Sequence, residues 1–150
     1  MVADKLIRTV KIILLHDDLV LTFLRDDLPG LPWAGMWDFP GGVREAGETV
    51  EECVVRETFE EFCIQIDPAS FSWSRLYPWK DGSGWYAKLF AATLEERLIP
   101  EIQLGNEGQE WRLMPVTEFL KHEKATPHYK ESLHEYLSEC HPEMIQTASI

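Results

Sequence analysis

The stretch Gly42–Ile64, GVREAGETVEECVVRETFEEFCI, decides the fold and points to the chemistry. It follows a Pro-Gly-Gly turn and carries Glu57, Glu60 and Glu61 close together. If the segment is helical, an advance of about 100° per residue places the three carboxylates within an arc of about 100°. Like charges this close are unfavourable unless a cation lies among them, and carboxylate oxygens suit Mg²⁺ or Mn²⁺. The pattern therefore predicts a divalent-metal site.

The polar spacing extends beyond these carboxylates. Five residues separate Gly42 from Glu48, seven separate Glu48 from Arg56, and the stretch closes on the aliphatic Ile64. This order resembles the signature of the Nudix hydrolases, Gly-x5-Glu-x7-Arg-Glu-U-x-Glu-Glu-x-Gly-U, where U is aliphatic. All charged positions match. The resemblance covers 23 residues, and the rest of the chain agrees with it by length and order of elements.

Two positions depart from the signature. Thr58 replaces an aliphatic residue on the predicted packing side of the helix, and Cys63 replaces a glycine. Glycine suits the left-handed residue that ends many helices, so a cysteine there costs about 1 kcal/mol. Because the carboxylates precede Cys63, the predicted metal site is preserved.

Composition predicts one globular domain over residues 1–150, as expected for 150 residues with 45% hydrophobic content. The formal net charge of −12 argues against broad nucleic-acid or membrane-surface binding but permits a nucleotide ligand. The apolar run Ile12–Leu15 is too short to span a membrane, and no secretion signal is visible. Either a monomer or a homodimer is compatible with these features.

The three cysteines, Cys53, Cys63 and Cys140, are odd in number and lack C-x-x-C spacing. This usage favours free thiols and a cytoplasmic location. Cys140-His141 is half of a possible zinc site, but without a second close pair a helix-end cysteine and a surface histidine are the simpler interpretation.

Before the signature, the pattern predicts a hairpin, a surface loop and a short strand. Thr49-x-x-Glu52 is a capping-box pattern, so a helix should begin near Thr49. Its less polar side should pack on a sheet and hold the carboxylates on the other side. The predicted segments are strands 6–15 and 19–25, loop 26–36, strand 37–39, and the helix with packing residues Val54, Val55, Thr58 and Phe62.

After the signature, the turn Asp81-Gly82-Ser83-Gly84 predicts a second hairpin. Thr126-Pro127 supplies an N-cap and a proline at the first position of a final helix. The predicted segments are strands 71–80, 85–94 and 110–114, a polar loop 105–109, helix 116–122, a final helix with apolar stripe Tyr129, Leu133, Tyr136 and Leu137, and a frayed tail after about 142. The order is mixed α/β, and the Nudix resemblance implies an α/β/α sandwich with a mixed sheet.

The resemblance also assigns roles. It implies that Glu57, Glu60 and Glu61 bind Mg²⁺ or Mn²⁺ with the carbonyl of Gly41 or Gly42 nearby, and that Arg56 orients a carboxylate. Arg56 could instead form an ordinary surface salt bridge. Glu48 could support a ligand or position water, but a carboxylate at a helix start is also favourable for capping.

Many Nudix members recruit a further carboxylate from a later loop, and Glu107 and Glu110 in NEGQEW are candidates for it. A solvated acidic loop is the alternative. A nucleobase would need aromatic faces and polar edges. Trp79 and Trp85 are candidates for stacking, although most aromatic residues belong to the core, and Asp38 could read a base edge or cap the turn.

These features predict a divalent-metal-dependent pyrophosphohydrolase that acts on a nucleoside diphosphate linked to another group. The favoured substrate is a nucleoside triphosphate, including an oxidised one, cleaved to the monophosphate and pyrophosphate. ADP-ribose is the alternative substrate, although the complete downstream motif expected for it is absent. A nucleotide-binding sensor without turnover is the alternative function, against which the intact charged positions argue.

Overall fold

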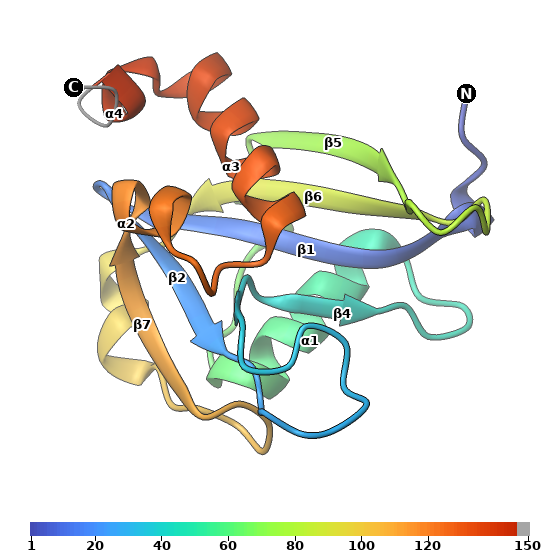
Figure 1. Ribbon diagram of the computed structural model, residues 1–150, viewed down its shortest axis with the longest axis horizontal. Helices are drawn as coiled ribbons and strands as arrows, with labels where there is room; N and C mark the ends of the chain where they lie inside the picture. Colours follow the sequence, from blue (N-terminus) through green and yellow to red (C-terminus); the bar gives the residue numbers. More distant parts are fainter. Residues whose placement is uncertain (147–150) are drawn as a thin grey trace.

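The computed structural model describes residues 1–146, in which one mixed sheet forms the centre (Figure 1). The strand order is β3-β2-β1-β6-β5, with β4 paired to β1 and β7 paired to β2. Only the β1–β6 pairing is parallel among the strand pairs of this part of the chain. The strands are β1 (Ile7–His16), β2 (Leu19–Leu24), β3 (Trp37–Asp38), β4 (Gly41–Val43), β5 (Trp73–Pro78), β6 (Tyr86–Thr93) and β7 (Glu110–Pro115).

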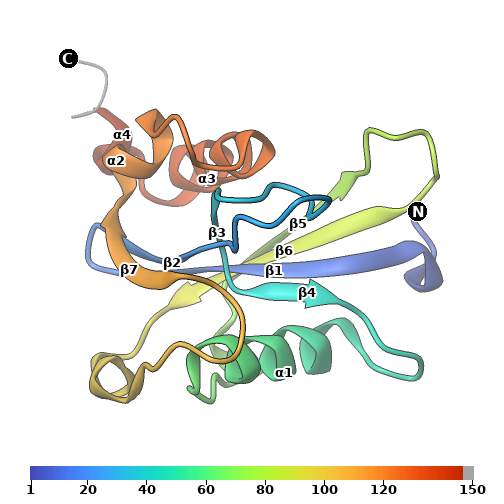
Figure 2. The ribbon, with the colours of Figure 1, turned by 60° about the horizontal axis from the view of Figure 1, so that its bottom comes forward.

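Helices cover both faces of this sheet (Figure 2). α1 (Val50–Phe62) lies on one face, and α2 (Val116–Lys121) and α3 (Pro127–Cys140) lie on the other. Two apolar clusters fill the layers, one containing Val54 and Phe62 of α1 and the other containing Phe119 and Leu133 of the opposite helices. The predicted α/β/α sandwich is confirmed. Short 3-10 turns occupy Asp4–Leu6, Pro68–Ser70 and Glu96–Glu101.

Both predicted hairpins are confirmed. β1 turns into β2 through Asp17, whose φ of 53° is common for aspartate in tight turns. β5 and β6 pair antiparallel from Trp73↔Ala91 to Pro78↔Tyr86. No helix within residues 1–146 has the length and apolar character needed to cross a membrane.

The predicted start of α1 is confirmed atom by atom. The Thr49 hydroxyl accepts from the Glu52 backbone N–H at 3.0 Å, and the Glu52 carboxylate accepts from the Thr49 N–H at 2.9 Å. The helix ends at Cys63, which has the expected left-handed conformation with φ 60° and ψ 25°.

The packing side of α1 differs from the expectation in one respect. Val54, Thr58 and Phe62 are buried as predicted, but Glu61 is also buried, with 7% exposure. It therefore lies at the edge of the packing face rather than on the solvent side with Glu60. The reason is the turn after β3, which covers Glu61 and donates a backbone hydrogen bond to it.

The C-terminal helices bring two corrections. Thr126 stands at the N-cap of α3, but its hydroxyl donates to the Trp37 carbonyl at 3.0 Å instead of capping the helix. The chain after 142 was expected to fray, yet Pro142–Gln146 form the helix α4, and Met144 and Ile145 pack against the second apolar cluster. The remaining part of that expectation, residues 147–150, lies outside the described residues.

The edge of β1 is shared by two partners, and this division positions the turn at residues 40–42. β2 pairs with the end of β1 at Leu15 and His16, whereas β4 pairs with its first half, where Lys11 faces Gly41. The chain enters β4 through Pro40, whose carbonyl accepts from the Ile12 N–H at 2.9 Å. The Pro-Gly-Gly turn is thereby held against the centre of the sheet and beside α1.

Candidate active site

Arg56 contacts four carboxylates at once. Its guanidinium forms two hydrogen bonds to Glu48, at 2.6 and 3.1 Å, and reaches Glu57 at 3.0 Å and Glu60 at 3.2 Å. Glu45 lies 3.6 Å away. The hydrogen bond from Arg56 is the main reason that the pKa of Glu48 is lowered. The cation expected among these carboxylates is thus partly supplied by the chain itself.

Glu57 lies directly against Gly42. A Cβ on Gly42 would come within 2.5 Å of the Glu57 carboxyl carbon, so only glycine leaves room for this carboxylate. Burial raises the pKa of Glu57, and the neighbouring Arg56 only partly offsets this. The glycine pair therefore forms the turn and also allows the Glu57 side chain to approach the backbone closely.

Glu61 is fixed by the first glycine of the same pair. Its Oε1 accepts from the Gly41 N–H at 2.9 Å. Gly41 has φ +135°, and a Cβ there would lie 2.1 Å from the Val10 carbonyl oxygen. Burial raises the pKa of Glu61 to about 8, although Lys11 and the Gly41 N–H act in the opposite direction. Burial therefore has a larger effect on this carboxyl than the two groups that favour its charged form.

Lys11 is a site residue that the sequence analysis missed. Its buried ammonium donates to Asp38 at 3.0 Å and to the carbonyls of Phe39 and Gly41 at 3.2 Å each. Burial lowers the pKa of Lys11, but the charge of Asp38 and its other acidic neighbours outweigh burial, and the net pKa is raised. The available signal was a lone lysine within the apolar run of β1, because a buried charge requires a partner.

Asp38 takes the capping role rather than the base-reading role. It is 3% exposed, and its Oδ1 accepts from the Phe39 N–H at 2.7 Å. Its Oδ2 accepts from Lys11 at 3.0 Å and from Arg25 at 3.1 Å. With both oxygens engaged, the expectation that Asp38 reads a base edge is not supported by this geometry.

The donor set fits a hard divalent cation. Glu57 and Glu61 are carboxylates with raised pKa values beside the cradle that Gly42 leaves open, and exposed Glu60 lies one position before Glu61. As the side chains stand in residues 1–146, no three His, Cys, Asp or Glu side chains converge on one point. The Gly42 carbonyl faces the Cys53 thiol at 3.7 Å, and the Gly41 carbonyl accepts from Lys11.

The later acidic loop is attached to the end of α1. The Gln103 N–H donates to the Phe62 carbonyl at 3.1 Å and the Gly105 N–H donates to the Glu61 carbonyl at 2.8 Å. A Cβ on Gly105 would lie 1.9 Å from the Glu60 carbonyl oxygen. Glu107 and Glu110 follow this junction and are exposed, Glu110 at the start of β7. The first part of the loop is thus bonded to the C-terminal end of α1, whereas Gly108 and Gln109 are bonded to Asp26 and Leu24.

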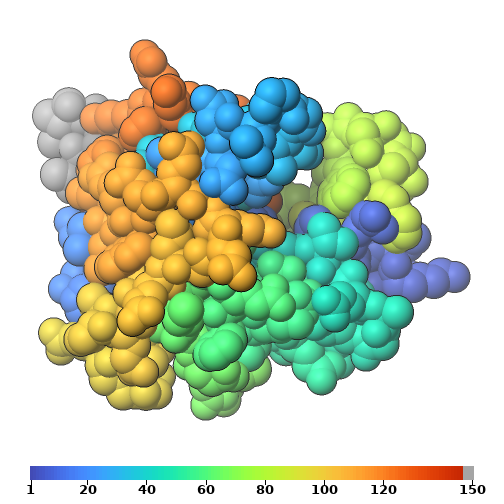
Figure 3. All heavy atoms as spheres, turned by 90° about the horizontal axis from the view of Figure 1, so that it is seen from below, coloured from blue at the N-terminus to red at the C-terminus, as the bar shows by residue number. Residues whose placement is uncertain are grey.

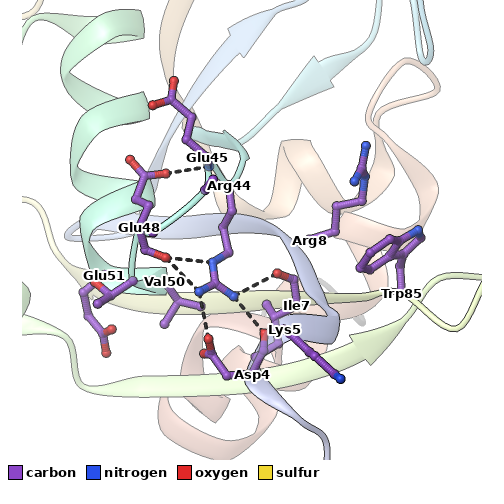
Figure 4. Close-up of a pocket in the computed structure, with 13 residues that line it drawn as sticks. Asp4, Lys5, Ile7, Arg8, Arg44, Glu45, Glu48, Val50, Glu51 and Trp85 are labelled. Atoms are coloured by element: carbon purple, nitrogen blue, oxygen red, sulfur yellow. Dashed lines mark hydrogen bonds and ion pairs between the residues drawn. The ribbon is translucent and has the colours of Figure 1, made fainter.

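The two predicted stacking residues have intramolecular partners. The Trp79 indole N–H donates to the Thr9 hydroxyl at 3.3 Å, and the Arg8 guanidinium lies 5.1 Å from the Trp85 ring centroid. Trp85 and Arg8 line a hollow of about 730 Å³ beside the start of α1 (Figure 4). At its centre Arg44 donates to carbonyls of Asp4, Ile7 and Glu48, which ties the N-terminal segment to the loop before α1.

A second hollow is visible between loop 26–36 and the turn of the β5–β6 hairpin, above the residues around β4 (Figure 3). Loop 26–36 was predicted as a surface loop, and its backbone is closed by bonds from Arg25 N–H to Met36 and from Gly35 N–H to Asp26. The cysteine prediction is met within the described chain, where Cys53, Cys63 and Cys140 are free. The His141 ring instead contacts Tyr136 and Glu143.

The family comparison agrees with this arrangement. The sequence model of the NUDIX domain matches residues 5–136. A Caenorhabditis elegans protein that carries a nudix hydrolase name is 43% identical over 56 residues, which are 37% of this chain and 14% of that protein. The chain therefore corresponds to only a small part of this relative.

Solved structures share the fold at low sequence identity. The MutT protein from Methanosarcina mazei Go1 superimposes with a TM-score of 0.65 and 20% identity, covering 89% of this chain and 94% of that one. A bifunctional NMN adenylyltransferase/ADP ribose pyrophosphatase from Francisella tularensis, complexed with AMP and manganese, gives a TM-score of 0.73 and 20% identity over 88% of this chain and 41% of that one.

Proposed function

The chain belongs to the NUDIX domain family, and this domain indicates a pyrophosphohydrolase enzyme. We propose that the protein hydrolyses a phosphoanhydride in a nucleoside diphosphate linked to another group. The observation that carries the proposal is the arrangement of Arg56, Glu57 and Glu61 around the Gly41-Gly42 turn. Burial disfavours the charged forms of Glu57 and Glu61, and a cation bound between them would stabilise those charged forms.

Mg²⁺ or Mn²⁺ is the cofactor proposed, with Glu57, Glu60 and Glu61 holding it. When bound, such an ion neutralises phosphate charge and lowers the pKa of water. The fold supports this role because α1 is capped at Thr49 and packed on the sheet, which limits the movement of the three side chains. The negative charge of the chain, −12, makes a metal-complexed nucleotide a better ligand than the free anion.

The chain's own residues then have distinct tasks. Arg56 holds Glu48, Glu57 and Glu60 in fixed relative positions through its hydrogen bonds. Lys11 fixes the backbone of Phe39 and Gly41, and Gly41 in turn fixes Glu61. Glu107 and Glu110 are exposed and follow the segment that is bonded to the end of α1, and they are the proposed candidates for accepting a proton from the attacking water.

We infer a nucleoside triphosphate, including an oxidised one, as the favoured substrate, with nucleoside monophosphate and pyrophosphate as products. Support comes from the short chain, the WDFPGG approach to the turn and the GQEW loop. ADP-ribose is the second candidate, because the Francisella tularensis protein of similar fold is named as an ADP ribose pyrophosphatase.

A panel of nucleotides tests both levels of the proposal. Purified protein is incubated with Mg²⁺ or Mn²⁺ and either the nucleoside triphosphates, an oxidised purine triphosphate or ADP-ribose, and products are identified by mass spectrometry. The expected result is pyrophosphate with the highest kcat/KM for one or two triphosphates. Preferential conversion of ADP-ribose to AMP and ribose phosphate would replace the substrate and keep the reaction class. Binding without any cleavage would favour the sensor alternative.

A further inference from the structure

We propose that the nucleobase of the substrate stacks on the indole of Trp33, an inference that rests on the function proposed above. Trp33 lies in loop 26–36, which borders the hollow between that loop and the β5–β6 hairpin (Figure 3). Its side chain is among the large hydrophobic side chains that remain exposed, at 48%. An exposed indole beside a nucleotide site offers the flat apolar surface that a base requires.

The backbone of Trp33 is strained for a bulky residue. Its φ of 55° lies in the left-handed region, which favours glycine, asparagine and aspartate. The other non-glycine residues of this kind in residues 1–146 are Asp17, in a tight turn, and Cys63, at a helix end. Trp33 lies in the turn over residues 32–35, where a bulky residue is unusual, and strain of this type persists where the surrounding structure imposes it, often at ligand sites.

Hydrogen bonds hold the backbone of the loop around Trp33. The Trp33 carbonyl accepts from the Met36 N–H at 3.1 Å, and the adjacent Pro32 carbonyl accepts from the Arg25 side chain at 3.1 Å. The same Arg25 guanidinium bonds Asp38, which is part of the buried group at the Pro-Gly-Gly turn. The backbone beside Trp33 is therefore tied through Arg25 to Asp38, next to the turn that fixes Glu61.

One neighbour places Trp33 next to the candidate active site. Its ring packs with that of His128 at a centroid distance of 5.2 Å and an angle of 63°. His128, at the start of α3, is close enough to Asp38 and Lys11 for both charges to act on it. Trp33 therefore packs against α3, whose His128 lies within electrostatic range of the buried Lys11–Asp38 pair.

The competing aromatic side chains are less available. Trp37 is 5% exposed, Trp79 is bonded to Thr9, and the Arg8 guanidinium lies over one face of the Trp85 ring. Asp38 cannot donate or accept freely, because both of its oxygens are engaged. Base selection therefore depends on stacking area more than on hydrogen bonds to a base edge, so purines should bind modestly better than pyrimidines.

Three variants separate stacking from a structural role. Trp33→Asn removes the ring and suits the left-handed backbone, whereas Trp33→Phe retains a smaller ring. Leu28→Ala is the matched control, because Leu28 lies in the same loop and is 58% exposed. We expect Trp33→Asn to raise KM for the preferred nucleotide about tenfold or more with a smaller change in kcat, and Trp33→Phe to recover much of the affinity. The urea midpoint of Trp33→Asn should equal or exceed that of wild type.

An unchanged KM in folded Trp33→Asn, or a KM increase of the same size in Leu28→Ala, would overturn the proposal. A lower urea midpoint with unrescued KM in Trp33→Phe would assign Trp33 a structural role and also overturn it. Binding is measured separately with Mg²⁺ and α,β-methylene ATP, GTP, CTP and UTP, whose α–β bridge resists hydrolysis. If these analogues quench the tryptophan fluorescence of wild type but not of Trp33→Asn, and no natural nucleotide is hydrolysed, the result would support stacking on Trp33. The same result would contradict the proposed hydrolysis.

Discussion

Glu61 combines burial with a single well-defined backbone contact, which makes it a direct test of the carboxylate site. Glutamine at this position keeps an oxygen that accepts from the Gly41 N–H but removes the negative charge. We expect Glu61→Gln to remain folded and to lower kcat by about two orders of magnitude or more. Circular dichroism and steady-state kinetics check this, with Glu51→Gln on the same helix as the control. Wild-type turnover in folded Glu61→Gln would exclude Glu61 as a ligand.

Thr58, which departs from the signature, lowers the stability of the fold because its hydroxyl is buried without a partner in residues 1–146. Its hydroxyl is the buried side-chain polar atom without a hydrogen-bond partner in the described chain. Valine has the same shape without the hydroxyl, and we expect Thr58→Val to raise the free energy of unfolding by about 1 kcal/mol. Urea denaturation measures the change, and Thr93→Val, at an exposed position of β6, is the control. A lower midpoint for Thr58→Val would mean that the hydroxyl has a partner in solution.

At the scale of elements, Lys11 joins three parts of the sheet. It extends from β1 and bonds both to β3 and to the turn that precedes β4. Replacing Lys11 with methionine leaves Asp38 and two backbone carbonyls without their buried donor. We expect Lys11→Met to lower the free energy of unfolding by about 3–5 kcal/mol. Thermal and urea unfolding measure the loss, with the exposed Lys5→Met as the control. A loss as small as that of Lys5→Met would contradict the proposed role of this ammonium.

The pH dependence of the Lys11 contacts has a definite sign. The native pKa of Lys11 is raised above its ordinary value of 10.5, so its stabilising contribution is complete below pH 10.5. That contribution is lost only as the pH rises through the higher native pKa. The difference in stability between wild type and Lys11→Met should therefore stay constant from neutral pH to about pH 10.

For the whole molecule, a bound ion should shift the unfolding equilibrium by mass action. Desolvated Glu57 and Glu61 are unfavourable neighbours without a cation, and they are brought together only by folding. We expect millimolar Mg²⁺ to raise the Tm relative to chelator, and to do so less in Glu61→Gln. Differential scanning calorimetry measures both shifts. Equal Tm values with Mg²⁺ and with chelator would argue against a site formed by the native fold.

Local sequence determined the elements of this protein because their signals involve neighbouring residues. Thr49 and Glu52 cap α1 through contacts three residues apart, and the left-handed end at Cys63 falls where the signature carries a glycine. The spacing of Arg56, Glu57 and Glu60 likewise set their proximity, because one helix carries all three.

Tertiary structure decided which of these groups are buried and what they contact. Lys11 meets Asp38 across 27 positions, Arg25 reaches Asp38 from the residue after β2, and His128 meets Trp33 from α3. No local period encodes such pairs, since they depend on how β1 is shared between β2 and β4 and on where α3 packs. The sequence by itself therefore determined the family signature and its carboxylates, whereas only the packed sheet and helices decided that Asp38 is sealed, Glu61 buried and Trp33 exposed.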